Sequence, residues 1–320
     1  MMRPSYPPLD RLLDSTAYTA RRVARHARWA RTEGVRRLVE EDQLDPRSRI
    51  ATAWAKAQWR RRHGVARGQA VPVYVVGLQR SGTNMLLRGL DAAPEVQVHG
   101  ENDRRVFHRF RLRGPETVRN AIVASRHQFV LFKPLCDSQR VDQLLDLPGV
   151  APGRAVWAWR DAHDRARSEV AKFGASNLSA LRAIADGSDQ GMWQSERLPE
   201  PSRDLVRSFD LQTMSTDTAA VLFWYIRNLL FFDLGLDRRE DVLLSSYDEL
   251  VRDPERQMRR LCDFLGFPFR HELHQHVARR ESHGRRALDI DPRVDELADQ
   301  LTTRLQAHEQ SRWAAAGDRA

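Results

Sequence analysis

Short apolar runs and longer amphipathic stretches alternate along the chain from residue 71 onward. The apolar runs are bounded by glycine, proline or charged residues, as buried parallel strands are. They predict strands at Val71–Val76, Val96–Val98, Phe129–Lys133, Ala155–Trp159 and Val242–Ser245. Apolar residues recur at helical spacing in the segments Met85–Ala92, Arg104–Arg111, Glu116–Ser125, Arg140–Leu145, Asp164–Phe173, Thr218–Leu234, Glu255–Leu265 and Arg293–Gln306. This alternation predicts an α/β fold, a doubly wound parallel sheet flanked by helices.

The first 68 residues follow a different pattern, in which arginines separate apolar positions at helical spacing. They predict an N-terminal helical extension of two or three amphipathic helices, and a further helix in ATAWAKAQWRRRHGVARGQ. We favour helices that pack on the main domain with their arginines in solvent; the alternative is a basic surface for anionic lipid or a partner. Residues 69–310 then form the α/β domain, with a turn-rich insertion at 174–204, and residues 311–320 form a flexible tail.

The net charge adds a preference for anionic partners. The 320 residues carry 52 lysines and arginines against 43 acidic residues, a formal charge of +9. Such an excess suits nucleic acid, anionic lipid or a multiply phosphorylated cofactor. Only Lys56, Lys133 and Lys172 are lysines. An arginine-biased genome is the simplest explanation, so each lysine is more informative than each arginine.

Cysteine content and hydropathy narrow the cellular context. Cys136 and Cys262 predict small buried residues of a reducing cytosol, and no four Cys or His residues have zinc-site spacing. No apolar run is long enough to span a membrane, and the stretch MMRPSYPPLDRLLDS lacks the apolar centre of a secretion signal. We therefore expect a cytoplasmic protein. Peripheral contact with the inner membrane face and the oligomeric state are left open.

The stretch VPVYVVGLQRSGTNML combines an apolar strand, a loop with two glycines and the start of a helix. In an α/β sheet such a loop lies at the carboxyl edge, where ligands bind, and its N–H groups converge on an anion. Gly77 and Gly82 allow the turns, Ser81, Thr83 and Asn84 add donors, and Arg80 adds charge. A Walker loop requires Lys-Ser or Lys-Thr where this chain has Thr-Asn, so the loop is poorly suited to Mg·ATP.

The stretch GLQRSGTNML resembles the 5′-phosphosulfate loop of the sulfotransferases that use 3′-phosphoadenosine 5′-phosphosulfate (PAPS). The form with arginine before Ser-Gly-Thr is that of the bacterial, carbohydrate and protein-tyrosine branches. The resemblance implies a P-loop-type sheet and a PAPS site without metal. Asn84 departs from the pattern, which has Thr or Ser there, and the Lys-Thr-His of the small-phenol branch is absent.

Two further segments resemble the family. In AVWAWRDAHDRARSEVAKFG, Arg160 at a strand end and Ser168 eight residues later match the pair that binds the 3′-phosphate, and Lys172 on the same helix face could assist. In LLSSYDELVRDPERQMRRLCDFLGF, Tyr247 follows a strand and could contact the nucleotide. Weaker matches in a late loop that covers the cofactor are Ser282, Arg285 and Arg286.

The resemblance also implies residues for the chemistry. Its branch commonly uses a Glu after a Gly-Glu turn as the base, which points to Glu101, with His99 as the rival in the same stretch VHGENDRRVF. Lys133, at the end of an apolar strand, corresponds to a lysine near the transferring sulfuryl group, where it and Arg80 would stabilise charge. Asp161, His163 and Asp164 form a possible metal set, but helix capping by the acidic residues is the preferred interpretation.

The resulting hypothesis is a PAPS-dependent sulfotransferase that transfers a sulfuryl group to a hydroxyl of a carbohydrate, lipid-linked or other small-molecule acceptor. One alternative is a nucleotide-dependent phosphotransferase on the same fold, which the missing Walker lysine disfavours. Another is a non-catalytic basic binder of membrane or nucleic acid. No recognisable nucleic-acid-binding module is present in the sequence, which disfavours nucleic acid as a partner.

Overall fold

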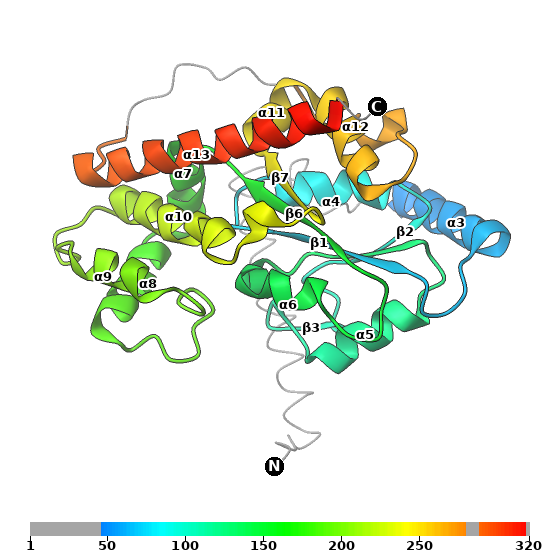
Figure 1. The fold of residues 1–320 in the computed structure, drawn as a ribbon, viewed down its shortest axis with the longest axis horizontal. Helices are drawn as coiled ribbons and strands as arrows, with labels where there is room; N and C mark the ends of the chain where they lie inside the picture. The colour runs from blue at the N-terminus through cyan, green and yellow to red at the C-terminus, as the bar shows by residue number, and fades with distance from the viewer. Residues whose placement is uncertain (1–45, 280–287, 318–320) are drawn as a thin grey trace, which may run out of the picture. The chain divides into compact units, whose positions relative to one another are not determined.

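The structure is a computed structural model that describes residues 46–279 and 288–317. Five parallel strands form its central sheet in the order β2-β5-β1-β6-β7 (Figure 1). The strands are β1 (Val71–Gly77), β2 (Val96–His99), β5 (Phe129–Phe132), β6 (Arg154–Trp159) and β7 (Val242–Ser246). Each coincides with a predicted strand to within one residue at either end, so the predicted parallel α/β sheet is confirmed.

Side chains of β1 alternate between two apolar cores, one on each face of the sheet. Val73 and Val75 face the core that includes α4 (Thr83–Asp91), α11 (Tyr247–Arg252) and α12 (Pro254–Leu265). Tyr74 and Val76 face the other core, which includes α5, α6, α7, α8, α10 and α13. These helices span Pro115–Ala124, Val141–Leu145, Ala162–Phe173, Ser176–Asp186, Thr216–Asp233 and Pro292–Gly317.

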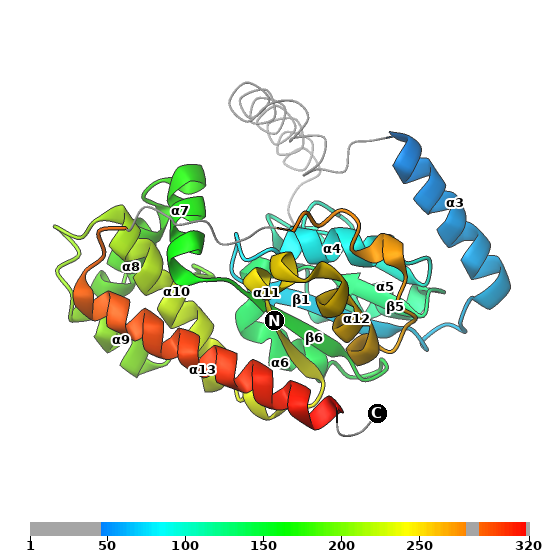
Figure 2. The same cartoon turned by 90° about the horizontal axis from the view of Figure 1, so that it is seen from above.

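The helices that follow β6 form a group of their own beside the sheet (Figure 2). The insertion at 174–204 contains α8 and leads into α9 (Glu200–Arg207); α8 packs on α10, and α9 packs on α8. Twelve residues of α10 are buried, and Ser215 begins this helix by accepting a hydrogen bond from the N–H of Thr218. This group extends the main core away from the sheet and supplies the buried Arg227 discussed below.

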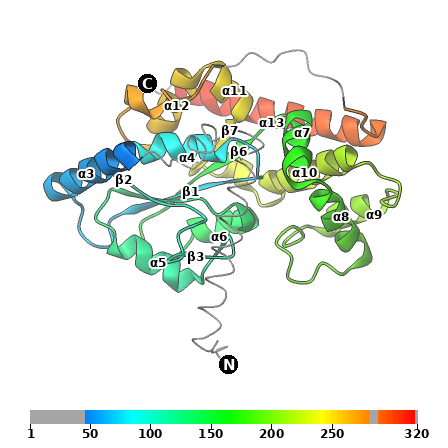
Figure 3. The same cartoon turned by 180° about the vertical axis from the view of Figure 1, so that it is seen from behind.

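The predicted helix at Arg104–Arg111 is wrong. The segment forms a two-stranded hairpin of β3 (Phe107–His108) and β4 (Arg111–Leu112), on the side of the sheet that carries α5 and α6 (Figure 3). The carboxylate of Asp137 accepts hydrogen bonds from the N–H of Leu112 (2.7 Å) and from the side chain of Arg111 (2.6 Å). These contacts reach 25 and 26 residues along the chain, so local periodicity did not reveal them.

Two other boundaries differ from the sequence expectation. Helix α13 extends to Gly317 and therefore includes residues 311–317 of the predicted tail. At the other end, α3 (Pro46–His63) matches the expected helix before residue 68, and the chain divides into compact units at Ala57–Gln58, within this helix. The predicted helices before residue 46 lie outside the described residues. Within the described ranges, no helix combines the length and the apolar character that a bilayer crossing requires.

Candidate active site at the carboxyl edge of the sheet

Close packing determines where glycine occurs in the loop after β1. Gly77 has a φ of 122°, and a Cβ atom there would lie 2.1 Å from the carbonyl oxygen of Ala158 in β6. Gly82 has a φ of 81°, and a Cβ atom there would lie 2.4 Å from the ring of Tyr247. Any other residue at these positions would displace a strand or an aromatic ring. The loop also contains Arg80 with a φ of 70°, a conformation that L-residues rarely adopt.

Ser138, a residue that the sequence analysis did not identify, anchors this loop. The hydroxyl of Ser138 accepts a hydrogen bond from the N–H of Gly77 at 2.9 Å. Ser138 lies in the 3-10 helix η1 (Leu135–Arg140) and is buried. Because 61 residues separate the two partners, no local motif in the sequence indicates the contact.

Residues from three separate sequence matches meet beside this loop. The Nε atom of Arg80 donates to the hydroxyl of Ser168 at 2.8 Å, and Nη1 of Arg160 donates to the carbonyl of Arg80 at 3.4 Å. The guanidinium of Arg160 also lies over the ring of Tyr247, 4.4 Å from its centroid. The loop match thus contacts the match around Arg160 and Ser168, and Arg160 contacts Tyr247 of the third match. All three lie at the carboxyl ends of β1, β6 and β7.

Two buried polar atoms at this edge lack hydrogen-bond partners among the described residues. They are the hydroxyl oxygen of Ser81 and the Nε atom of Arg160. An unsatisfied buried donor costs about 1–3 kcal/mol, which the oxygens of a bound anion would offset. Thr83, also buried, begins α4 directly after Gly82. A helix N-terminus beside unsatisfied donors and two arginines fits a phosphate or sulfate group.

The remaining predicted cofactor residues are placed less closely. Lys172 lies in the last turn of α7, one turn beyond Ser168, and its role stays a prediction. Ser282, Arg285 and Arg286 lie outside the described residues.

Lys133 connects the loop after β1 with the candidate base. It directly follows β5 and is buried, and its Nζ atom lies 3.0 Å from Oε2 of Glu101. The same Nζ donates to Oδ1 of Asn84 at 2.5 Å. The side-chain oxygen of Asn84, the residue that departs from the family pattern, therefore holds a lysine.

His99 has both ring nitrogens engaged. Nδ1 lies 2.7 Å from Oδ2 of Asp103, and Nε2 lies 3.0 Å from Nε2 of Gln97. The oxygen of the Gln97 amide accepts from Ser125, so its nitrogen donates to His99. The ring is then neutral with its proton on Nδ1, and burial lowers the pKa of His99. The ring also stacks on Phe132 (5.2 Å between centroids), as a structural side chain would.

A partly buried polar network joins η1, the hairpin, the 187–198 loop and α10. We call the side chains of Arg111, Asp137, Gln139, Glu196 and Arg227 the Arg227 network. Arg111 donates to Asp137 (2.6 Å) and Glu196 (2.7 Å); Gln139 donates to Glu196 (2.8 Å) and accepts from Arg227 (2.7 Å). Arg227 is 2% exposed, and burial lowers its pKa to about 10, which leaves it charged at neutral pH. The sequence did not reveal this network because its arginines resemble the many others.

Cys136 links this network with the candidate base. Its sulfur accepts from the side chain of Gln79 at 3.8 Å. Burial, followed by the charges of Glu101 and Asp137, raises the pKa of Cys136 to about 12. Cys136 and Cys262 are both buried free thiols, as the sequence predicted. The thiol of Cys136 is therefore protonated at neutral pH.

The residues that resembled a metal set have structural partners. Asp161 begins α7 by accepting from the N–H of Asp164 at 2.9 Å, which confirms the capping interpretation for Asp161. His163 pairs with Asp295 at 2.8 Å. Across the described residues, no group of three or more metal-ligating side chains gathers.

Comparisons with known proteins give a family for part of the chain. Residues 153–283, which contain Arg160, Ser168 and Tyr247, match the family model described as the sulfotransferase domain. No curated protein gives a significant sequence match.

Solved structures give more distant likenesses. A sulfotransferase from Alicyclobacillus acidocaldarius is 16% identical, with 77% of this chain and 96% of that chain covered and a TM-score of 0.39. The sulfotransferase domain of the curacin biosynthetic pathway is 14% identical (73% and 98% covered, TM-score 0.43). Sulfotransferase STF9 from Mycobacterium avium is 14% identical (70% and 70% covered, TM-score 0.37). The similarity of this chain to the sulfotransferase domain thus rests on residues 153–283.

Proposed function

We propose that the chain binds PAPS at the carboxyl edge of its sheet and catalyses sulfuryl transfer to the hydroxyl of an acceptor. The observation that carries this proposal is the meeting of Arg80, Ser168, Arg160 and Tyr247, which lie up to 167 residues apart in the sequence. A cation at each of two adjacent strand ends suits a ligand with two separate anionic groups.

The fit of the edge to such a ligand follows from its donors. The N–H groups at the start of α4 and the hydroxyl of Ser81 would hold the 5′-phosphosulfate, with Arg80 beside them. Arg160 and Ser168 would hold the 3′-phosphate. The Nε atom of Arg160 has no hydrogen-bond partner among the described residues. When bound, PAPS supplies an already activated sulfuryl group.

Glu101 is the proposed base. Its Oε2 atom is paired with Lys133, so its other oxygen is the one that would accept the proton of the acceptor hydroxyl. His99 is less suited because its Nε2 already accepts from Gln97 and its proton on Nδ1 is held by Asp103. The geometry therefore favours Glu101 over the alternative that the sequence left open.

Lys133 has two proposed tasks. It orients Glu101, and its ammonium group places positive charge where negative charge develops during transfer. Asn84 in turn holds Lys133 through Oδ1. In the family pattern, Thr or Ser at this position contacts the phosphate through its hydroxyl. In this chain, Asn84 is proposed to hold Lys133 instead.

The acceptor is proposed to be a carbohydrate, a lipid-linked compound or another small molecule with a free hydroxyl, and the reaction is proposed to take place in the cytoplasm. The basic last turn of α3, with Arg60, Arg61, Arg62 and His63, supports peripheral contact with an anionic membrane as a further part of the proposal.

Calorimetry with adenosine 3′,5′-bisphosphate, the product that retains both phosphates, tests the cofactor assignment. We expect tight binding without Mg²⁺. Binding of Mg·ATP together with no binding of the bisphosphate would instead support a phosphotransferase. Arg207→Ala, at an exposed position on α9, is the matched control for substitutions of Arg80 and Arg160.

A further inference from the structure

The hairpin segment Arg104–Arg113 is strongly basic. Its ten residues contain five arginines and His108 and no acidic residue. Arg105 pairs with Asp103, and Arg111 pairs with Asp137 and Glu196. The side chains of Arg104, His108, Arg109 and Arg113 are exposed. The hairpin therefore presents several basic side chains to solvent.

This hairpin is anchored beside the candidate base. On one side it follows the turn of Glu101, where the N–H of Asp103 donates to the carbonyl of Gly100 at 2.8 Å. On the other, the N–H of Leu112 donates to Asp137 in η1, which begins two residues after Lys133. Arg105 is four residues from Glu101, so their Cα atoms are at most about 14 Å apart. A molecule whose hydroxyl reaches Glu101 would pass close to the hairpin.

The tip of this hairpin has a strained backbone. Arg109 and Phe110 have φ values of 48° and 68°, and they are the two residues between β3 and β4. Two-residue hairpin turns of this kind favour Asn and Gly, and each bulky residue in this region costs about 1 kcal/mol or more. Phe110 is nevertheless 37% exposed. A strained turn that presents an aromatic ring and an arginine to solvent is typical of a ligand-binding loop.

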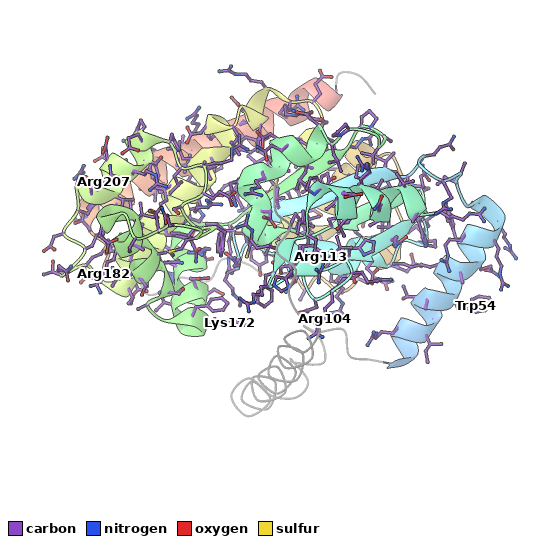
Figure 4. All side chains as sticks on the ribbon, turned by 90° about the horizontal axis from the view of Figure 1, so that it is seen from below. Trp54, Arg104, Arg113, Lys172, Arg182 and Arg207 are labelled. Atoms are coloured by element: carbon purple, nitrogen blue, oxygen red, sulfur yellow. The ribbon has the colours of Figure 1, made fainter. Side chains whose placement is uncertain are left out.

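Arginines of the hairpin lie close enough to act together. Nε of Arg113 donates to the carbonyl of Arg104 at 3.0 Å, and both residues are labelled on the same part of the surface in Figure 4. Guanidinium groups pair with phosphate, sulfate or carboxylate through two parallel hydrogen bonds. The exposed ring of Phe110 adds a flat apolar surface on which the C–H face of a sugar can rest.

We propose that the hairpin Arg104–Arg113 is the acceptor-recognition element and that the acceptor is a saccharide already carrying phosphate, sulfate or carboxylate groups. The role as acceptor rests on the proposed sulfuryl transfer, whereas binding of an anionic saccharide does not. Arginine forks hold the anionic groups, and the saccharide presents its hydroxyl toward Glu101.

Binding of dextran sulfate and of uncharged dextran to the full chain saturated with adenosine 3′,5′-bisphosphate tests the surface. Saturation keeps the probe out of the cofactor edge. We expect dextran sulfate to bind and dextran not to bind. The double substitution Arg109→Gln and Arg113→Gln should weaken binding about tenfold or more. The bisphosphate affinity of this variant should not change, which also shows that it is folded.

The matched control removes the same charge from another part of the surface. Arg182→Gln with Arg207→Gln, on α8 and α9 (Figure 4), should weaken binding less than twofold. Equal losses in the two double variants would overturn the proposal, because net charge alone would explain binding. Hairpin-dependent binding to vesicles of phosphatidylcholine and phosphatidylglycerol (3:1) without binding of dextran sulfate would overturn it in favour of a membrane surface.

The charge of the acceptor is tested directly with an extract of the host organism. The extract is separated on an anion exchanger before incubation with the protein and labelled PAPS. We expect the label to enter material that the exchanger retained. Label confined to the unretained fraction would overturn the anionic acceptor while leaving the proposed sulfuryl transfer intact. Absence of bisphosphate binding would overturn the proposed function itself.

Discussion

Arginine has different surroundings at the carboxyl edge of the sheet, the proposed cofactor edge, and in the Arg227 network. At the edge, Arg80 and Arg160 contact a hydroxyl, a carbonyl and an aromatic ring, and the carboxylate of Asp164 lies 3.7 Å from Arg160. In the network, Arg111 contacts two carboxylates at less than 3 Å, and Arg227 donates to an amide and to backbone carbonyls.

The difference separates cations that stabilise the fold from cations that are available to a ligand. Arg227 donates through both terminal nitrogens to an amide and to backbone carbonyls and so holds its neighbours in place, although its Nε has no partner among the described residues. Arg160 also has a buried Nε without such a partner, but its other polar contacts are longer, at 3.4 Å and 3.7 Å, so we expect it to gain more from an anion. In a chain with so many arginines, the partners of each one are more informative than its presence.

The largest expected effect comes from the network. Arg227→Met should lower the free energy of unfolding by about 3–5 kcal/mol, because it leaves Gln139 and nearby carbonyls without their buried partner. Chemical denaturation measures this loss, and Arg207→Met, on an exposed helix position, should cost less than about 0.5 kcal/mol. Bisphosphate affinity should be retained by the folded protein. A stable variant with weakened bisphosphate binding would reverse the two roles.

The next effect concerns the chemistry between the two regions. Glu101→Gln should lower turnover by about 10² or more, since the variant cannot accept the hydroxyl proton. Bisphosphate affinity should stay within about twofold because Glu101 contacts Lys133 and not the edge. Label transfer from PAPS measures the rate. An undiminished rate would assign the base to another residue, and the matched substitution His99→Gln then becomes decisive.

A buried carboxylate, Glu309, makes the stability of the protein depend on pH. Glu309 of α13 accepts from the indole N–H of Trp159 (3.2 Å) and the N–H of Ser246 (3.3 Å), and burial raises its pKa to about 7. Since the folded-state pKa lies above the unfolded value, the stabilisation is present at low pH and lost as pH rises toward 7. Between pH 5 and 7 the loss should be about 2 kcal/mol.

Urea denaturation at several pH values measures this dependence on Glu309. Glu309→Gln keeps the shape of the side chain but does not titrate, so its unfolding free energy should vary less over the same range. A wild-type protein with no loss between pH 5 and 7 would mean that Glu309 is ionised in the folded state throughout.

The smallest effect is expected at the cofactor edge itself. Arg160→Ala should weaken the bisphosphate about tenfold, as expected for one charge-assisted contact. Its unfolding free energy should change little, because Arg160 has few strong protein partners. A large loss of stability with unchanged affinity would place Arg160 with Arg227 and remove the distinction between the regions.

The strands of the sheet were predictable because each is a short apolar run that can be recognised from its own residues. The expectation that Arg160 reaches the same edge as the loop after β1 followed from the rule that parallel strands end at one edge. The hairpin was not predictable, since Asp137, far along the chain, fixes its pairing. The roles of Asn84 and His99 likewise depend on single partners, Lys133 and Gln97, that periodicity does not reveal.

The hydrogen bond between Gly77 and Ser138 joins the loop after β1 to η1, so the two segments are expected to move together. Ser138 is one residue from Asp137, which holds the hairpin, and five from Lys133, which holds Glu101. We therefore expect a ligand that orders this loop to order the residues around Glu101 and the hairpin as well. By thermodynamic reciprocity, if the bound cofactor raises the affinity for the acceptor by some factor, the bound acceptor raises the affinity for the cofactor by the same factor. The order in which the two substrates arrive then alters the kinetics of binding and leaves the stability of the ternary complex unchanged.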